Sequence, residues 1–182
     1  MPAANSSGDY LNPDGRRLGR CQYCGHCERF VCEAHAKATP DHLLYPVLRA
    51  RPNFELRTRA QVLHVDYDRS TRRALGVRYL DLETGEEYQQ PADVVVLAAF
   101  TMTNTRLLLL GGIGEICKAM GADPGSSVVS PHLQHWSADN LFVVGASVYP
   151  HNSGYNPTGP LAALALRLGD DLLRYISRPT RL

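Results

Sequence analysis

The chain has 182 residues, of which 44% are hydrophobic and 20% charged, and its formal net charge is +1. This length suits one domain, or a domain with an appendage, and can bury a real core. The near-zero charge gives no electrostatic case for nucleic acid or an anionic membrane. No apolar run reaches the roughly 18 residues of a membrane span. The first residues lack the pattern of a secretory signal, so we expect a cytoplasmic location, or a periplasmic one if an export signal lies upstream.

The N-terminal segment, residues 1–38, is predicted to be a cysteine-rich loop. Four of the five cysteines, Cys21, Cys24, Cys27 and Cys32, fall close together in it. Thiolates at such separations suit zinc or an iron–sulfur cluster, which makes the four thiols candidate metal ligands. A zinc ribbon commonly uses two separated pairs, so reduced, packed thiols are the alternative.

The second predicted domain, residues 39–182, begins with a helix and an antiparallel meander. Pro40 and Asp41 are typical of a helix start, and we expect this helix to run to about Arg51. Alternating apolar and polar residues then predict short strands. These strands are expected at residues 54–56, 61–67, 74–82 and 86–90.

Two later segments differ from the meander because their apolar residues are continuous. Residues 93–99 and 141–145 have the Val-rich pattern of strands buried on both faces in a parallel sheet. Thr103 or Asn104 is expected to cap a short helix between them, with a short strand near 126–130. Apolar residues at helical spacing predict a final helix from Pro160 onward. The pattern indicates an α/β fold, as part of a three-layer, Rossmann-like nucleotide-binding domain.

The second parallel strand ends in small residues, Gly145 and Ala146. At the carboxyl edge of a sheet, such residues let a flat or phosphorylated cofactor approach the backbone. A polar loop follows and leads to the N-terminus of the final helix, where free N–H groups favour an anion or the edge of a reduced flavin. The alternative is that residues 156–158 only start the helix.

Several stretches resemble the glucose–methanol–choline (GMC) oxidoreductases, particularly their gluconate and 2-keto-sugar dehydrogenase branch. The closing stretch is NLFVVGASVYPHNSGYNPTGPLAALALRLGDDL, and ADVVVLAAFTMTNTRLLLL resembles the strand and helix that line FAD in this family. NFELRTRAQVLHVDYDRSTRRALGVRYLD resembles the preceding meander. The resemblance implies an FAD-dependent oxidoreductase acting on the CH–OH group of a polyol, sugar or sugar acid.

The same resemblance assigns site residues. It implies that Asn156 is the second polar residue of the catalytic pair and hydrogen-bonds the substrate hydroxyl. His151 precedes it by five positions and is not the base. Residues matching positions that contact FAD are Val62, Ala98, Ala99, Gly145, Ala146, Pro157 and Thr158. Phe100 departs from a glycine that is common in the family. His132 and His135 have metal-compatible spacing, but we expect surface or packing roles.

Two parts of the family pattern are missing. The phosphate-binding glycine motif would lie upstream, and residues 111–120 replace most of the substrate domain, including its catalytic histidine. No histidine occurs between His64 and His132. We therefore expect weak or no FAD binding and no turnover from this chain alone. The alternatives are a non-catalytic truncated product, such as a cysteine-rich metal-binding or interaction protein, and a split-enzyme fragment that needs a partner chain; an electron acceptor is a further expected partner.

Overall fold

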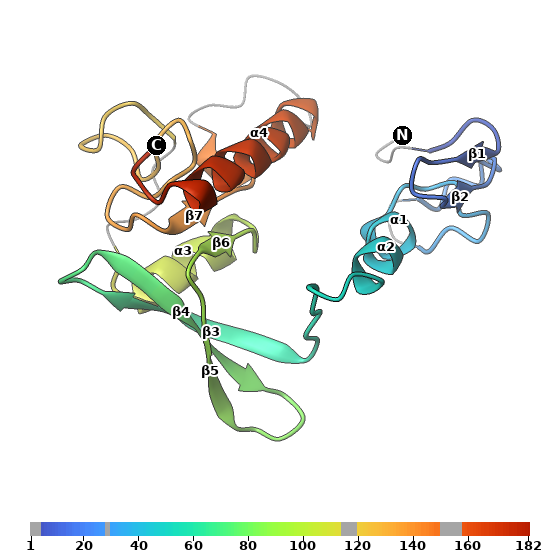
Figure 1. The fold of residues 1–182 in the computed structure, drawn as a ribbon. Coiled ribbons are helices and arrows are strands. Elements are labelled where there is room, and N and C mark those ends of the chain that lie inside the picture. The colour runs from blue at the N-terminus through green and yellow to red at the C-terminus, as the bar shows by residue number, and fades with distance from the viewer. Residues whose placement is uncertain (1–4, 28–29, 114–119, 150–157) are drawn as a thin grey trace. The chain divides into compact units, whose positions relative to one another are not determined.

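The computed structural model describes residues 5–27, 30–113, 120–149 and 158–182. The chain divides into two compact units, Met1–Thr58 and Arg59–Leu182 (Figure 1). The sequence predicted a boundary after residue 38, whereas the contacts group the next two helices with the N-terminal unit. Among the described residues, no helix combines the length and apolarity needed to cross a membrane.

The first unit holds a small hairpin and two short helices. Its elements are β1 (Tyr10–Leu11), β2 (Arg17–Leu18), α1 (Pro40–Leu43) and α2 (Tyr45–Arg49). A single helix was predicted here, but the chain turns at Leu44 because Pro46 has no N–H to donate to the preceding turn. The predicted strand at residues 54–56 is wrong, since this stretch is irregular.

The predicted meander is confirmed in the second unit. It consists of β3 (Ala60–Asp68), β4 (Arg73–Asp81) and β5 (Glu87–Pro91), antiparallel in that order. The pairing of β3 with β4 shifts between Val62, which faces Tyr79, and His64, which faces Arg78. Leu63 is therefore an extra residue, and such a bulge bends and twists its strand locally.

Two short parallel strands form the centre of the second unit, as the continuous apolar runs predicted. β6 (Val95–Leu97) pairs with β7 (Leu141–Val143), so that Val95 faces Leu141 and Leu97 faces Val143. The predicted strand at 126–130 is wrong, because only two isolated bridges occur there, from Val129 to Met120 and from Val129 to His135.

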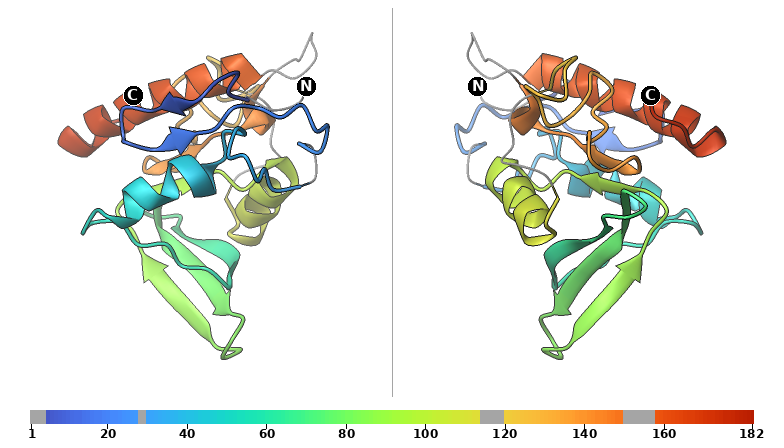
Figure 2. Two further views of the ribbon diagram at one scale, coloured as in Figure 1. Left: turned by 90° about the vertical axis from the view of Figure 1, so that its right-hand side faces the viewer. Right: turned by 90° about the vertical axis from the view of Figure 1, so that its left-hand side faces the viewer.

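Helices lie on both faces of this parallel pair. α3 (Thr101–Leu110) follows β6, a 3-10 turn η1 (Ala146–Val148) follows β7, and α4 (Thr158–Ser177) comes last. Figures 1 and 2 show α4 on one side of the strands and α3 on the other, which gives three layers. The α4 side is packed through the Phe142 and Tyr175 rings, whose centroids are 5.5 Å apart. The core contains buried residues of all these elements: Val65, Val95, Leu97, Leu107, Leu108, Phe142, Leu168 and Tyr175.

Candidate functional site

The carboxyl ends of β6 and β7 lie side by side. The N–H of Val144 donates to the carbonyl of Leu97 at 3.0 Å, so the chain leaves both strands at the same edge. A groove of about 800 Å³ borders β6 at this edge. The meander contributes Val62 and Val77 to its lining, and α3 contributes Arg106. This is the edge at which open α/β sheets bind ligands.

Five residues assigned from the sequence meet around this edge. Val62, Ala98 and Ala99 line the groove together, although Val62 comes from the meander and the two alanines follow β6. Ala98 and Ala99 are exposed and present only methyl groups. Gly145 and Ala146 follow the neighbouring strand β7.

The remaining assigned residues lie at or before the start of α4. Asn156 and Pro157 fall outside the described residues, as do His151 and the fifth cysteine, Cys117. Thr158 is the first residue of α4. The polar half of the expected site, and the proposed role of Asn156, therefore stay predictions.

A residue shortly after each strand has a backbone conformation that side chains disfavour. Gly145 has φ 128° and ψ 178°, and a Cβ added there would meet only Ser147 Oγ, at 3.9 Å. The backbone angle, rather than crowding, therefore requires glycine at this position. Phe100 has φ 68° and ψ 161°, in a region occupied essentially by glycine alone. The sequence carried the signal for this strain, since Phe100 stands where the resembled family has glycine.

Asn104 has a different role from the helix cap that was considered for it. α3 begins at Thr101, with Phe100 as the preceding cap residue. Asn104 is fully buried in the first turns, and its Oδ1 accepts the N–H of Ala99 at 2.8 Å. Its Nδ2 lies 3.5 Å from the carbonyl of Leu97. Asn104 thereby fixes the segment after β6 against α3, a role that the sequence pattern did not predict.

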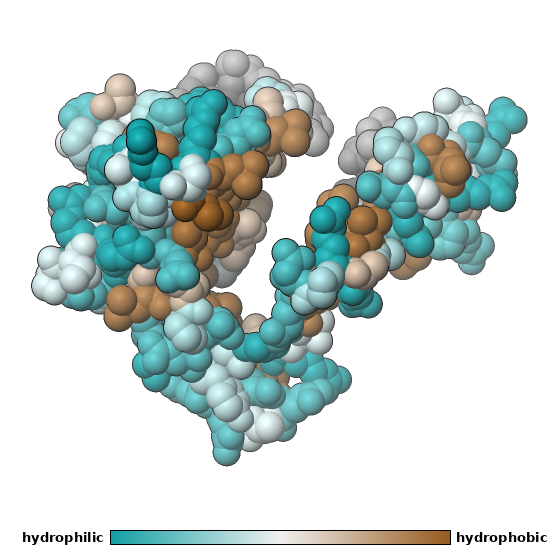
Figure 3. Space-filling view, in the orientation of Figure 1, coloured by the Kyte–Doolittle hydropathy of each residue, from teal (hydrophilic) through white to brown (hydrophobic). Residues whose placement is uncertain are grey.

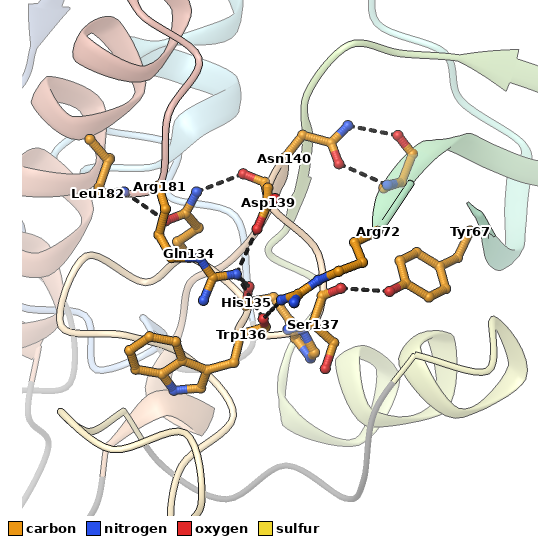
Figure 4. A network of polar contacts seen from close by, with 11 residues as sticks. Tyr67, Arg72, Gln134, His135, Trp136, Ser137, Asp139, Asn140, Arg181 and Leu182 are labelled. Atoms are coloured by element: carbon orange, nitrogen blue, oxygen red, sulfur yellow. Dashed lines mark hydrogen bonds and ion pairs between the residues drawn. The ribbon is translucent and has the colours of Figure 1, made fainter. Parts of the chain in front are cut away.

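A polar network holds the chain just before β7 (Figure 4). Arg181 donates to Asp139 at 2.6 Å, and Gln134 Nε2 donates to the carbonyl of Asp139 at 2.6 Å. The N–H of Leu182 donates to Gln134 Oε1 at 3.0 Å. Arg181 and Leu182 thus hold the loop that leads into β7 through hydrogen bonds.

The two histidines near this loop have packing roles. His132 Nδ1 lies 2.9 Å from a carboxylate oxygen of Asp171, a buried residue of α4. His135 is 2% exposed, and its Nδ1 accepts the N–H of Ser137 at 3.1 Å. Burial, with a smaller contribution from the charge of Arg181, lowers the pKa of His135 to about 4. His135 is therefore neutral at physiological pH.

In the first unit, the four clustered cysteines are free and line one cavity of about 340 Å³. The Nδ2 of Asn5 lies 3.3 Å from the sulfur of Cys27 and 3.9 Å from that of Cys21. A hydrogen bond from the N–H of Lys37 is the largest of the effects that lower the pKa of Cys32.

No three His, Cys, Asp or Glu side chains among the described residues are arranged to hold a metal ion. The zinc or iron–sulfur assignment to the cysteines therefore stays a prediction from the sequence.

The second unit has the features of a mixed α/β protein of the cofactor-binding type. Its parallel strands are covered by helices on both faces, and their ends open on a groove with small residues. Two family models, both described as GMC oxidoreductase, match residues 1–140 and 117–165. The chain therefore belongs to the GMC oxidoreductase family, which confirms the resemblance noted from its sequence.

Curated relatives match only part of their own length. The chain is 47% identical to the gluconate 2-dehydrogenase flavoprotein of Pantoea cypripedii over 115 residues, which are 63% of this chain and 18% of the relative. It is 35% identical to the 6'''-hydroxyparomomycin C oxidase of Streptomyces lividus over 98 residues, or 54% of this chain and 18% of that protein. It is 44% identical to the 2-methyl-1,2-propanediol dehydrogenase of Mycolicibacterium austroafricanum over 59 residues, or 32% of this chain and 10% of that protein.

Proposed function

We propose that this chain forms the FAD-facing part of an oxidoreductase that acts on the CH–OH group of a polyol, sugar or sugar acid. The observation that carries the proposal is the convergence of Val62, Ala98 and Ala99 on one groove at the carboxyl end of β6. Family membership and the printed names of the relatives support the reaction class. A small-molecule alcohol or sugar and an electron acceptor are the expected partners.

The groove suits the adenosine end of FAD. Its walls are largely aliphatic, and Ala98 and Ala99 leave the backbone accessible at the strand end. Val62, which lines the groove, borders the bulge of β3, where the pairing with β4 is locally disrupted. Arg106 adds a positive charge on the α3 side, and the uncapped start of α3 faces the same edge with free N–H groups.

In this proposal the residues after β7 lie at the other end of FAD, where the reaction takes place. Bound FAD would supply the hydride acceptor. Gly145 and Ala146 keep the backbone close to the cofactor, and Asn156 hydrogen-bonds the hydroxyl of the substrate. Asn156 orients the alcohol but does not accept its proton at neutral pH, because a side-chain amide is not a base. In this proposal a second group, other than Asn156, accepts the proton of the hydroxyl.

The proposal predicts weak flavin binding by the isolated chain. A purified preparation should show little flavin absorbance and no dye reduction with gluconate. Titration with FAD, followed by quenching of flavin fluorescence, should still reveal binding that Ala99→Leu weakens about tenfold, since the longer side chain enters the groove. Ala163→Leu, on an exposed position of α4, is the matched control. Equal binding by both variants would argue against the groove as the cofactor site.

A second candidate function rests on the first unit. The shared cavity of Cys21, Cys24, Cys27 and Cys32 supports a non-catalytic, cysteine-rich metal-binding or interaction protein. A visible absorption spectrum of protein purified without oxygen separates the two candidates, because flavin and iron–sulfur clusters absorb differently. Zinc, which is colourless, would be detected by elemental analysis and lost in a variant with all four cysteines changed to serine.

A further inference from the structure

Phe100 combines two features that each lower the stability of the chain. Its φ of 68° and ψ of 161° lie in a region that is occupied essentially by glycine. Its side chain is also 73% exposed, so a large apolar surface stays in contact with water. A ring this exposed makes few contacts with the described residues, and its packing therefore does not offset the strain. Strain of this kind commonly marks a functional position.

Asn104 holds Phe100 in this conformation from both sides. The N–H of Asn104 donates to the carbonyl of Phe100 at 2.8 Å, and its side-chain Oδ1 accepts the N–H of Ala99 at 2.8 Å. The strained backbone bonds of Phe100 lie between these two hydrogen bonds. Because Asn104 is fully buried, Phe100 cannot relax without breaking a buried interaction. The strain is therefore built into the start of α3.

Phe100 lies at the rim of the groove beside β6. It directly follows Ala99 and comes three positions before Thr103, and both of these residues line the groove. Figure 3 shows hydrophobic surface gathered below α4 and beside β6. Val62 and Val77 give the groove an aliphatic wall, and Phe100 adds an exposed aromatic ring next to it. The groove thus offers apolar surface to a flat ligand.

A flat aromatic side chain in this place favours a flat aromatic partner, because aromatic rings stack face to face with an offset. FAD contains two such rings, the adenine and the flavin. Gly145 and Ala146 follow β7 and are assigned to the flavin end, whereas Phe100 follows β6 beside Ala99, at the adenosine end. Arg106, which also lines the groove, offers a positive charge for the phosphates. Adenine is therefore the ring that Phe100 would meet.

We propose that Phe100 is a positioning residue for the adenine of FAD. Its ring stacks on the adenine, and the strain held by Asn104 keeps the ring out of the core and available for this contact. The inference rests on the proposed function and adds to it a residue at which the chain departs from the glycine that is common in the resembled family. Phe100 thus lowers the stability of the free chain and raises its affinity for an adenine nucleotide.

NMR of the ligand signals, with the full 182-residue chain, tests the stacking directly. The probes are ADP, which has the adenine but no flavin, and FMN, which has the flavin but no adenine. We expect the adenine ring protons of ADP to move upfield on binding, because an aromatic ring shields protons that lie over its face. Phe100→Ala should weaken ADP binding about tenfold and abolish this shift, while FMN binding stays unchanged.

Three further variants separate the ring from the backbone strain. Phe100→Trp keeps an aromatic face and should bind ADP at least as tightly as the native chain. Phe100→Gly should raise the thermal unfolding temperature and yet weaken ADP binding as much as Phe100→Ala does, since both lack the ring. Met102→Ala is the matched control: Met102 is 78% exposed in the same turn, is not one of the described residues that line the groove, and should leave ADP affinity unchanged.

Four outcomes would overturn the inference. Equal ADP affinity in the native chain and Phe100→Ala is one, and ADP binding without an upfield shift is another. FAD binding that Ala99→Leu weakens but Phe100→Ala does not would remove Phe100 from the site and leave the groove as the cofactor site. No binding of FAD or ADP by the native chain at millimolar ligand would overturn the proposed function as well.

Discussion

Asn140 binds Ala74 through both ends of its side-chain amide. Its Oδ1 accepts the N–H of Ala74 at 2.7 Å, and its Nδ2 donates to the carbonyl of Ala74 at 2.7 Å and to that of Asp93 at 2.8 Å. Asn140 is fully buried and immediately precedes β7. One side chain therefore joins the meander, the segment before β6 and the start of β7.

The Asn140→Ala variant should be strongly destabilised. It leaves the N–H and carbonyl of Ala74 and the carbonyl of Asp93 without this partner in a buried site, which we expect to cost about 3 kcal/mol. Urea unfolding followed by fluorescence of Trp136, the single tryptophan, measures the effect. Gln89→Ala, on the exposed strand β5, should change the free energy of unfolding little; a similar loss in both variants would contradict the assignment.

Phe100→Gly should stabilise the protein. The φ of Phe100 is 68° with ψ 161°, a strain of about 1–3 kcal/mol for a residue with a side chain. Glycine removes this strain, and its greater unfolded-state entropy offsets about 0.5–1 kcal/mol. Since the Phe100 side chain is largely exposed, little burial is lost, and we expect a net gain of about 1 kcal/mol. Phe100→Ala keeps the Cβ and should show no such gain when both are compared by thermal unfolding.

Acid should destabilise the second unit through His135. Its folded pKa of about 4 lies below the unfolded value near 6.5, so between these pH values the unfolded chain binds a proton that the folded chain does not. The contribution of His135 is fully present above pH 6.5 and is lost as the pH falls toward 4, by up to roughly 3 kcal/mol. Urea unfolding at several pH values should show this slope in the native protein and a shallower one in His135→Gln. His26→Gln, in the first unit, should keep the native slope.

Removing the charge of Asp171 should loosen α4. Its carboxylate is 3% exposed, and Arg167, Arg174 and His132 lie within 3.7 Å of it. We expect Asp171→Asn to cost about 1 kcal/mol, because the arginines remain largely solvated and gain back hydration. The neighbouring exposed Asp170→Asn is the control. Thermal unfolding at low and high salt checks the result; no difference between the two variants would mean that the cluster contributes nothing.

Sequence patterns located the strands whose residues are buried in a regular order, either alternately or continuously. Alternation located β4, and the continuous apolar runs identified β6 and β7 as parallel, buried strands. The apolar stripe also located α4. The turn at Leu44 was missed although Pro46 gave a local signal for it.

Local sequence patterns could not predict the hydrogen bonds that join distant segments around the candidate site. Asn140 and Ala74 are 66 positions apart, and no spacing rule links a polar residue before one strand to a backbone group in another. The sequence predicts that Asn104 caps a helix. In the structure it lies inside α3, where its side chain accepts a hydrogen bond from the N–H of Ala99. Val62, which lines the groove, also borders a bulge that the alternating pattern of β3 conceals.

The pairing of β6 with β7 also has a consequence for how the chain folds. Val95 and Leu141 are 46 positions apart, whereas the hairpins of the meander close over a few residues. Hairpins form within about 10 microseconds, so the meander can assemble as soon as it leaves the ribosome. At about 5–20 residues per second, β6 then waits several seconds for its partner to be synthesised. During that interval its Val-rich run has both edges free, which exposes it to aggregation and to chaperone capture.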